Sequence, residues 1–131
     1  MKRLCSILMM LVVLISFCGC TQTSVDEGAD VVLTFIYEEK SISVTLEADE
    51  AARVVSILSG NQYDPLFCGI PSCGFDKNIS LKVGDRIFAI ACDTCNAVQD
   101  LSNLRCFDIP TEDMEYIHSL FEKYGGYFPC V

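Results

Sequence analysis

Residues 78–92, NISLKVGDRIFAIAC, determine the fold that we expect for this chain. Every second residue from Ile79 to Val83 is apolar, and a second apolar run follows the dipeptide Gly84-Asp85. A Gly-Asp dipeptide between two such runs is typical of a tight two-residue turn. The stretch therefore predicts an antiparallel β-hairpin that buries one face.

The turn also predicts the register of this hairpin, because each residue before it pairs with one after it. The expected pairs, from the turn outward, are Val83–Arg86, Leu81–Phe88, Lys77–Cys92 and, by extension, Cys73–Asn96. This register brings Cys73 close to Cys92 and Cys95. A disulfide from Cys73 to either of them would then need little movement of the backbone.

The preceding part of the chain has the same kind of pattern. Alternating apolar residues at 31–37 and 42–46 flank a short charged break, which predicts a first hairpin. The period then becomes helical over 48–60, where Asp49 and Glu50 suit a first turn and Gly60 suits the end. The apolar stripe expected on this helix is Ala51, Val54, Val55 and Leu58.

The part of the chain after the hairpin predicts a short strand and a last helix. Residues 104–109, LRCFDI, have the composition of a strand, whereas 96–101, NAVQDL, could form a short helix. Residues 110–126 predict a helix with Met114, Ile117 and Phe121 on its apolar face. The expected fold is α+β: an antiparallel sheet of two hairpins plus a short strand, with two helices packed on one face. It reads as two ββα-like units, at 31–60 and 78–125.

The segment between these units, residues 61–76, predicts a loop that contains two prolines and two cysteines. A loop of this length in a small domain is usually functional or pinned. We expect its apolar side chains to form an interaction surface; they are Tyr63, Leu66, Phe67 and Ile70. The alternative is that these side chains simply cover the core.

The N-terminus has the pattern of an export signal. Lys2 and Arg3 precede an apolar run over residues 4–17, which as a helix of roughly 21 Å is shorter than a hydrocarbon core of roughly 30 Å. Such a run reads as a signal peptide rather than as a membrane span, although an uncleaved anchor is the alternative. Gly19 and Cys20 end the run, and polar residues follow.

This arrangement resembles the lipobox of bacterial lipoproteins, in which a small residue precedes an acylated cysteine. The resemblance implies that Cys20 is lipidated and becomes the mature N-terminus, because the rival Cys18 would place the bulky Phe17 before the cleavage site. Phe17 itself departs from the usual leucine at its position. The expected organisation is a signal peptide at 1–19, the lipidated Cys20 with a flexible tether at 20–30, and one domain at 31–131. The protein would be exported and anchored to the extracytoplasmic face of a bacterial membrane.

Cleavage would leave an acidic domain with an even number of cysteines. Removing Lys2 and Arg3 from the 9 basic residues leaves 7 against 18 acidic ones, a net charge of −11. Such a surface repels nucleic acid, so we expect no nucleic-acid partner. Small exported domains commonly hold disulfides. The candidates for a disulfide-stapled fold are Cys68, Cys73, Cys92, Cys95, Cys106 and Cys130.

The motif Cys92-Asp-Thr-Cys95 resembles the redox site of the thioredoxin family, which implies thiol–disulfide exchange. The context departs from that family, because a hairpin precedes the motif and 36 residues are too few to complete the fold. We therefore expect both cysteines to be structural and neither to be a low-pKa nucleophile. Zinc is the other alternative, but the spacing of the cysteines and His118 fits no finger or ribbon.

His118 is the single histidine, and we expect it to lie partly covered on a helix face rather than to serve as a base. The expected function is therefore a non-catalytic, lipid-anchored binding or interaction module with an unknown protein partner, no metal and no cofactor. The alternative is an extracytoplasmic thiol–disulfide protein that uses Cys92 and Cys95.

Overall fold

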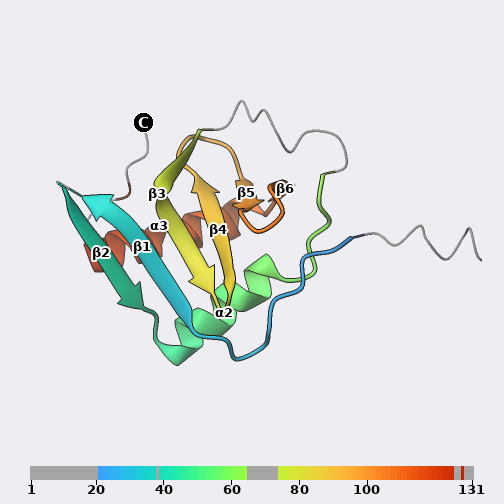
Figure 1. The fold of residues 1–131 in the computed structure, drawn as a ribbon, viewed down its shortest axis with the longest axis horizontal. Coiled ribbons are helices and arrows are strands. Elements are labelled where there is room, and N and C mark those ends of the chain that lie inside the picture. Colours follow the sequence, from blue (N-terminus) through green and yellow to red (C-terminus); the bar gives the residue numbers. More distant parts are fainter. Residues whose placement is uncertain (1–20, 38, 65–73, 126–127, 129–131) are drawn as a thin grey trace, which may run out of the picture.

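The computed structural model of the chain describes residues 21–37, 39–64, 74–125 and 128. These residues form one antiparallel sheet with two helices (Figure 1). The strands are β1 (Val31–Tyr37), β2 (Lys40–Thr45), β3 (Phe75–Val83), β4 (Arg86–Ala91), β5 (Ala97–Asp100) and β6 (Arg105–Asp108). They lie in the order β2-β1-β3-β4-β5-β6. The helices are α2 (Ala48–Leu58) and α3 (Thr111–Gly125).

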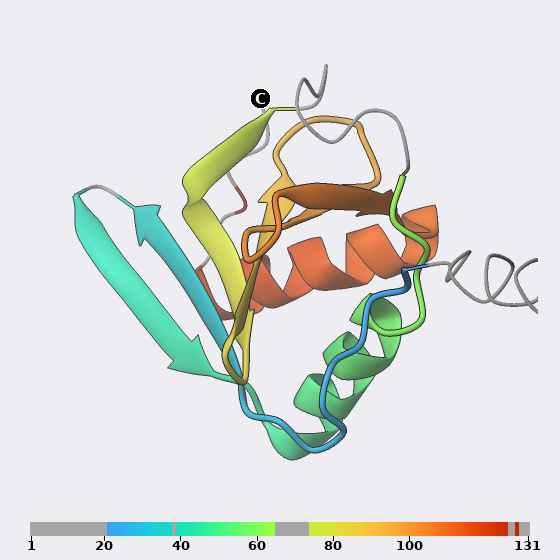
Figure 2. The same ribbon diagram turned by 45° about the vertical axis from the view of Figure 1, so that its right-hand side comes forward.

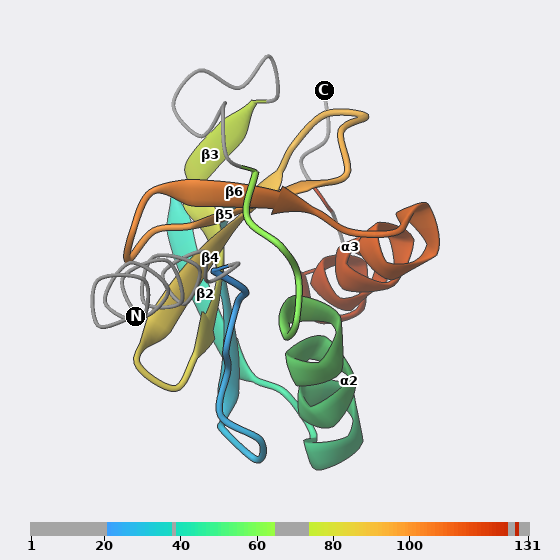
Figure 3. The same ribbon diagram turned by 90° about the vertical axis from the view of Figure 1, so that its right-hand side faces the viewer.

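Both helices cover the same face of the sheet, as the side view in Figure 3 shows. The α+β class and the placement of the helices are thus confirmed. The side chains between the two layers come from alternate strand positions and from one face of each helix. The largest fully buried ones are Phe35, Phe88, Phe107, Phe121, Leu33, Leu58, Ile79, Leu81, Ile90, Ile117, Val31 and Val54.

The expected register is confirmed near the β3–β4 turn and is wrong further away. Val83 pairs with Arg86 and Leu81 with Phe88, and Gly84 supplies the positive φ of 57° that the turn requires. A bulge then interrupts β3 between Phe75 and Ser80. Ala91 consequently pairs with Phe75, so Lys77–Cys92 is not a register pair. The expected pair Cys73–Asn96 is not tested, because Cys73 lies outside the described residues.

The sheet has more strands than the sequence pattern predicted. Residues 97–100, within the stretch that could have formed a short helix, are strand β5 and pair with both β4 and β6. The second unit is therefore ββββα rather than ββα. Figure 2 shows β5 and β6 crossing over the end of β4, which closes this side of the core.

The helices form where the apolar periodicity predicted them. The stripe on α2 is buried as expected, and Ile57 joins it. Glu47 and Glu50 make a capping box at the start of α2, and Gly60 follows its end with a φ of 75°. The predicted stripe on α3 is also buried, together with Leu120. Within the described part of the chain, no helix is long and apolar enough to cross a membrane.

A carboxylate links the two helices. Glu50 of α2 accepts hydrogen bonds from Lys123 Nζ at 2.7 Å and from the Tyr124 hydroxyl at 2.5 Å, both on α3. Partial burial raises the pKa of Glu50, but these hydrogen bonds outweigh it and hold the pKa below its ordinary value. The ionised carboxylate therefore fastens α3 against α2.

Candidate functional site

The segment Thr21–Ser24 lies directly after Cys20 in sequence and is bound to the domain. Gln22 forms an isolated bridge with Gln62, and Thr23 is 3% exposed. The Thr23 amide donates to the Asn61 carbonyl at 2.8 Å, and its own carbonyl accepts from Gly60 at 2.9 Å. Thr21–Ser24 therefore packs like an extra strand, whereas the sequence pattern predicted a flexible tether. The difference arises because Thr23 satisfies backbone groups just after α2, which no local pattern reveals.

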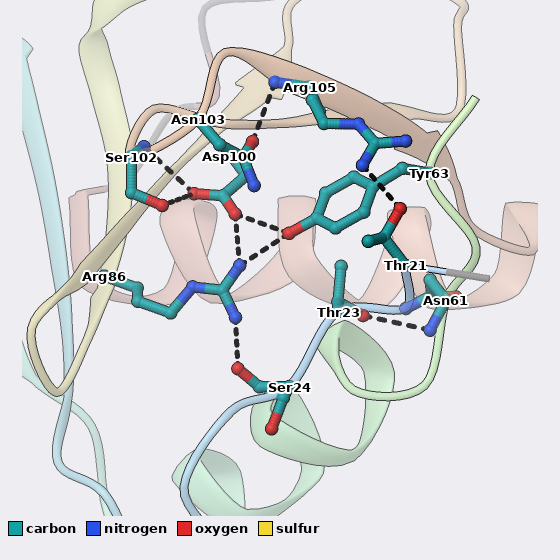
Figure 4. Close-up of polar contacts among 10 residues, drawn as sticks. All are labelled: Thr21, Thr23, Ser24, Asn61, Tyr63, Arg86, Asp100, Ser102, Asn103 and Arg105. Carbon is teal, nitrogen blue, oxygen red and sulfur yellow. Dashed lines mark hydrogen bonds and ion pairs between the residues drawn. The ribbon is translucent and has the colours of Figure 1, made fainter. Parts of the chain in front are cut away.

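Asp100 is the centre of a polar cluster next to this segment (Figure 4). Its side chain is 0% exposed, at the end of β5. The carboxylate pairs with Arg86 and accepts a hydrogen bond from the Tyr63 hydroxyl at 2.6 Å. Its other oxygen accepts from the Ser102 amide at 3.0 Å and the Ser102 hydroxyl at 2.5 Å. We call Asp100, Arg86, Tyr63 and Ser102 the Asp100 cluster.

The hydrogen bonds keep Asp100 ionised although it is buried. Burial raises the pKa of Asp100, but the hydrogen bonds from Ser102, Tyr63 and Arg86 lower it by more. The net pKa therefore lies below the ordinary value. The pKa of Tyr63 is raised by burial and by its bond to Asp100. A carboxylate has about four acceptor sites, and four hydrogen bonds fill them here. The cluster is therefore built to hold chain segments together rather than to take a proton from a substrate.

Two arginines attach Thr21–Ser24 to this cluster. Arg86 donates to the Ser24 carbonyl as well as to Asp100 and Tyr63. Arg105, at the start of β6, donates to Thr21 Oγ1 at 2.6 Å and lies over the Tyr63 ring at 4.6 Å. Figure 4 shows both arginines reaching from the sheet to Thr21–Ser24 on either side of Tyr63.

The Cys92-Asp-Thr-Cys95 motif forms a tight loop after β4. Asp93 accepts a hydrogen bond from the Cys95 amide at 2.9 Å and another from the Gly74 amide at 2.8 Å. The Cys92 amide in turn donates to the Gly74 carbonyl at 2.7 Å. The aspartate between the two cysteines thus shapes the loop and holds it to the start of β3.

The two cysteines of the motif are not bonded to each other. Cys92 carries a free, buried thiol. Burial raises its pKa, and the nearby Asp76 and Asp93 carboxylates add to the rise. The sequence predicted that Cys92 is not a low-pKa nucleophile, and the raised pKa agrees with this. Cys92 was among the expected disulfide candidates, whereas its thiol is free in the structure.

The other cysteines give partial information on the expected staples. No disulfide joins two cysteines within the described ranges. Cys106 is half-buried in β6. Cys20, Cys68, Cys73 and Cys130 lie outside the described residues.

His118 lies partly covered on α3, as expected. Its ring stacks on Phe128 with centroids 3.9 Å apart, and it hydrogen-bonds the backbone of Ala91. Nε2 is buried and has no hydrogen-bond partner among the described residues. Burial lowers the pKa of His118, although Glu122 and Glu115 oppose the shift. The ring is therefore neutral and serves as a packing element.

The expected interaction loop is only partly described. Tyr63 is buried and its hydroxyl is used by the Asp100 cluster, so it does not offer an exposed surface. Leu66, Phe67 and Ile70 lie outside the described residues. For Tyr63, the alternative that the side chain covers the core is the correct one.

The Asp100 cluster was missed from sequence, since its members are far apart in the chain and Asp100 itself lies in β5, a strand that was not recognised. The available signal was the spacing of Val98 and Asp100, which would bury the aspartate on the same face as Val98 if AVQD were a strand. No three metal-ligating side chains come together in the described part of the chain. A shallow depression of about 380 Å³ separates residues 27–28 from α2, and its lining is Glu27, Gly28, Ala52, Val55, Ser56 and Ser59.

Comparison with known proteins yields no match to this chain among family models, curated proteins or solved structures.

Proposed function

We propose that this protein is an exported lipoprotein that is anchored through Cys20 and whose domain acts as a binding module at the membrane surface. The observation that supports the proposal most is the attachment of Thr21–Ser24 to the domain. Thr21, the residue directly after Cys20, accepts hydrogen bonds from Arg105 and from the Tyr63 amide, which follows α2. The anchor would therefore hold one side of a folded domain close to the bilayer.

The chemistry of the described side chains supports binding over catalysis. The buried carboxylate of Asp100 has its acceptor sites filled, the Cys92 thiol has a raised pKa, and His118 is stacked against Phe128. Each of these groups stabilises the fold, and this leaves the surface of the domain for recognition.

We also propose that disulfides staple the exported domain and that Cys95 belongs to one of them. An oxidising compartment would maintain such a bond, and each long-loop disulfide adds about 3 kcal/mol in the entropic view. Peptide mapping of the non-reduced protein tests this point. It should give a Cys95 peptide linked to Cys68, Cys73 or Cys130.

The anchor is tested by metabolic labelling with an alkyne-bearing fatty acid. Labelled protein should be recovered in the membrane fraction for the wild-type chain and for Cys18→Ala. Cys20→Ala should carry no label. A label that persists in Cys20→Ala and disappears in Cys18→Ala would place the anchor at the other cysteine. Absence of label from the wild type would refute the lipoprotein assignment.

A further inference from the structure

The turn between β5 and β6, residues 101–104, exposes two leucines close to Thr21. Leu101 is 37% exposed and Leu104 is 61% exposed. Arg105 immediately follows Leu104 and donates to Thr21 Oγ1. The turn therefore lies within the reach of one arginine side chain from the residue that follows Cys20.

The backbone of this turn makes the exposed leucine more unusual. Leu104 has a φ of 58°, in the left-handed region where a side chain with a Cβ is disfavoured. Glycine or asparagine normally occupies such a position. Asn103, one residue earlier, instead uses its side-chain oxygen to accept from the Arg105 amide at 2.9 Å. Neither turn geometry nor solvent exposure explains a leucine here, whereas contact with an apolar phase would.

Only one peptide unit separates the proposed anchor residue, Cys20, from the domain-bound Thr21. Cys20 is one residue from Thr21, and one residue spans at most about 3.6 Å. Thr21 is fixed by Arg105 and by the amide of Tyr63, which donates to its carbonyl. Lipid chains on Cys20 would thus enter the bilayer beside the β5–β6 turn, with no flexible spacer to let the domain tumble.

We propose that the β5–β6 turn inserts Leu101 and Leu104 into the interface of the bilayer that holds the lipid anchor. The inference rests on the proposed lipidation of Cys20. It replaces a domain that hangs from a tether with one that sits on the membrane in one orientation. Arg86 and Asp100 neutralise each other, and Arg105, next to the turn in sequence, adds one positive charge beside Thr21.

The opposite end of the sheet gives a matched control. Ile36 on β1 is 46% exposed, between the exposures of Leu101 and Leu104. Figures 1 and 2 both place the β1–β2 turn on the other side of the molecule from the start of the described chain. An apolar side chain at Ile36 should therefore stay in water when the turn meets the membrane.

The chain contains no tryptophan, so a single introduced one reports its own environment. The full-length protein, processed and purified from membranes, is reconstituted into phosphatidylcholine vesicles that carry brominated acyl chains. Leu104→Trp and Leu101→Trp should show blue-shifted emission and quenching by bromine, whereas Ile36→Trp should show neither. Leu101→Trp covers the case that tryptophan does not tolerate the left-handed backbone at 104.

The fatty-acid label on the same preparations separates the two proposals. Label on the protein, together with unquenched tryptophan at both turn positions, would overturn the inserted turn and leave the anchor standing. Equal quenching at Ile36 would overturn the fixed orientation. Protein without label would overturn the anchor, and the inference with it.

Discussion

Arg86 pairs with Asp100, whose carboxylate has no exposed surface, and the same guanidinium also donates to the Ser24 carbonyl. The pair joins the start of β4 to the end of β5, and it fastens Thr21–Ser24 to both. Burial of the carboxylate makes the pair important because an ion left alone in the interior is costly.

Removal of the arginine should therefore destabilise the fold strongly. We expect Arg86→Leu to lower the free energy of unfolding by about 3–5 kcal/mol, since Asp100 would remain buried without its cation. Urea denaturation of the domain measures this. Lys82→Ala, which removes an exposed positive charge from β3, should change it by less than about 0.5 kcal/mol. A loss from Arg86→Leu no larger than that from Lys82→Ala would mean that the buried pair does not form.

His118 should make stability depend on pH. The ring is partly covered and its Nε2 is buried, and this burial lowers its folded pKa below the ordinary value of 6.5. Below that value the unfolded chain takes up a proton that the folded chain does not, so stability falls by up to about 1.4 kcal/mol per pH unit until the folded pKa is reached. Above pH 7 the contribution is constant.

The variant His118→Phe keeps a ring against Phe128 and removes the titration. Thermal unfolding of both proteins between pH 5 and pH 8 should show a slope below pH 6.5 for the wild type and a flatter profile for the variant. Since the chain has one histidine, no other imidazole can contribute. Parallel profiles for the two proteins would contradict the buried neutral state of His118.

Gly125 at the end of α3 should not tolerate alanine. A Cβ at this position would overlap the ring of Phe35 from β1. Alanine improves helix propensity, yet we expect Gly125→Ala to lower the melting temperature, because overpacking costs about 1–3 kcal/mol. The double variant Phe35→Leu/Gly125→Ala should lose less stability than the sum of the two single variants. Ser119→Ala, on the exposed side of α3, serves as the control, and a Gly125→Ala protein as stable as that control would refute the close contact.

Cys92 should react only after unfolding. In the native protein iodoacetamide should label it slowly, because the thiol is buried and its pKa is raised. In guanidinium without reductant it should be labelled fully, whereas Cys95 should need reductant as well. Recovery of a Cys92–Cys95 disulfide would contradict the structure and restore the thiol–disulfide alternative.

The sequence was a good guide wherever one local pattern settled the structure. The hairpin at Gly84-Asp85, both apolar helix stripes and the placement of the helices on one face follow from period and turn chemistry. The prediction failed at β5, since four residues are too few to show a period and only the pairing with β4 and β6 makes them a strand. It also failed beyond the bulge in β3, because a register extended from a turn holds only while the ladder is regular.

Much of the candidate site depended on long-range contacts that no local pattern encodes. The sequence placed Tyr63 in a loop, whereas its side chain is buried against Phe107 and donates to Asp100, 37 residues away. Thr21–Ser24 is polar and shows no apolar periodicity, so the sequence predicted a tether. Hydrogen bonds to Asn61 and from Arg86 and Arg105 hold it to the domain instead. The lipidation of Cys20 stays a prediction from its signal pattern.

The central claim is that acylated Cys20 directly precedes a domain-bound segment. Mass spectrometry of the N-terminal peptide, from protein purified out of membranes, tests it most directly. The account predicts a peptide that begins at Cys20 and carries a diacylglycerol thioether, and predicts that Cys20→Ala abolishes both the modification and membrane retention. A mature peptide that begins elsewhere, or an unmodified Cys20 in membrane-bound protein, would contradict the account.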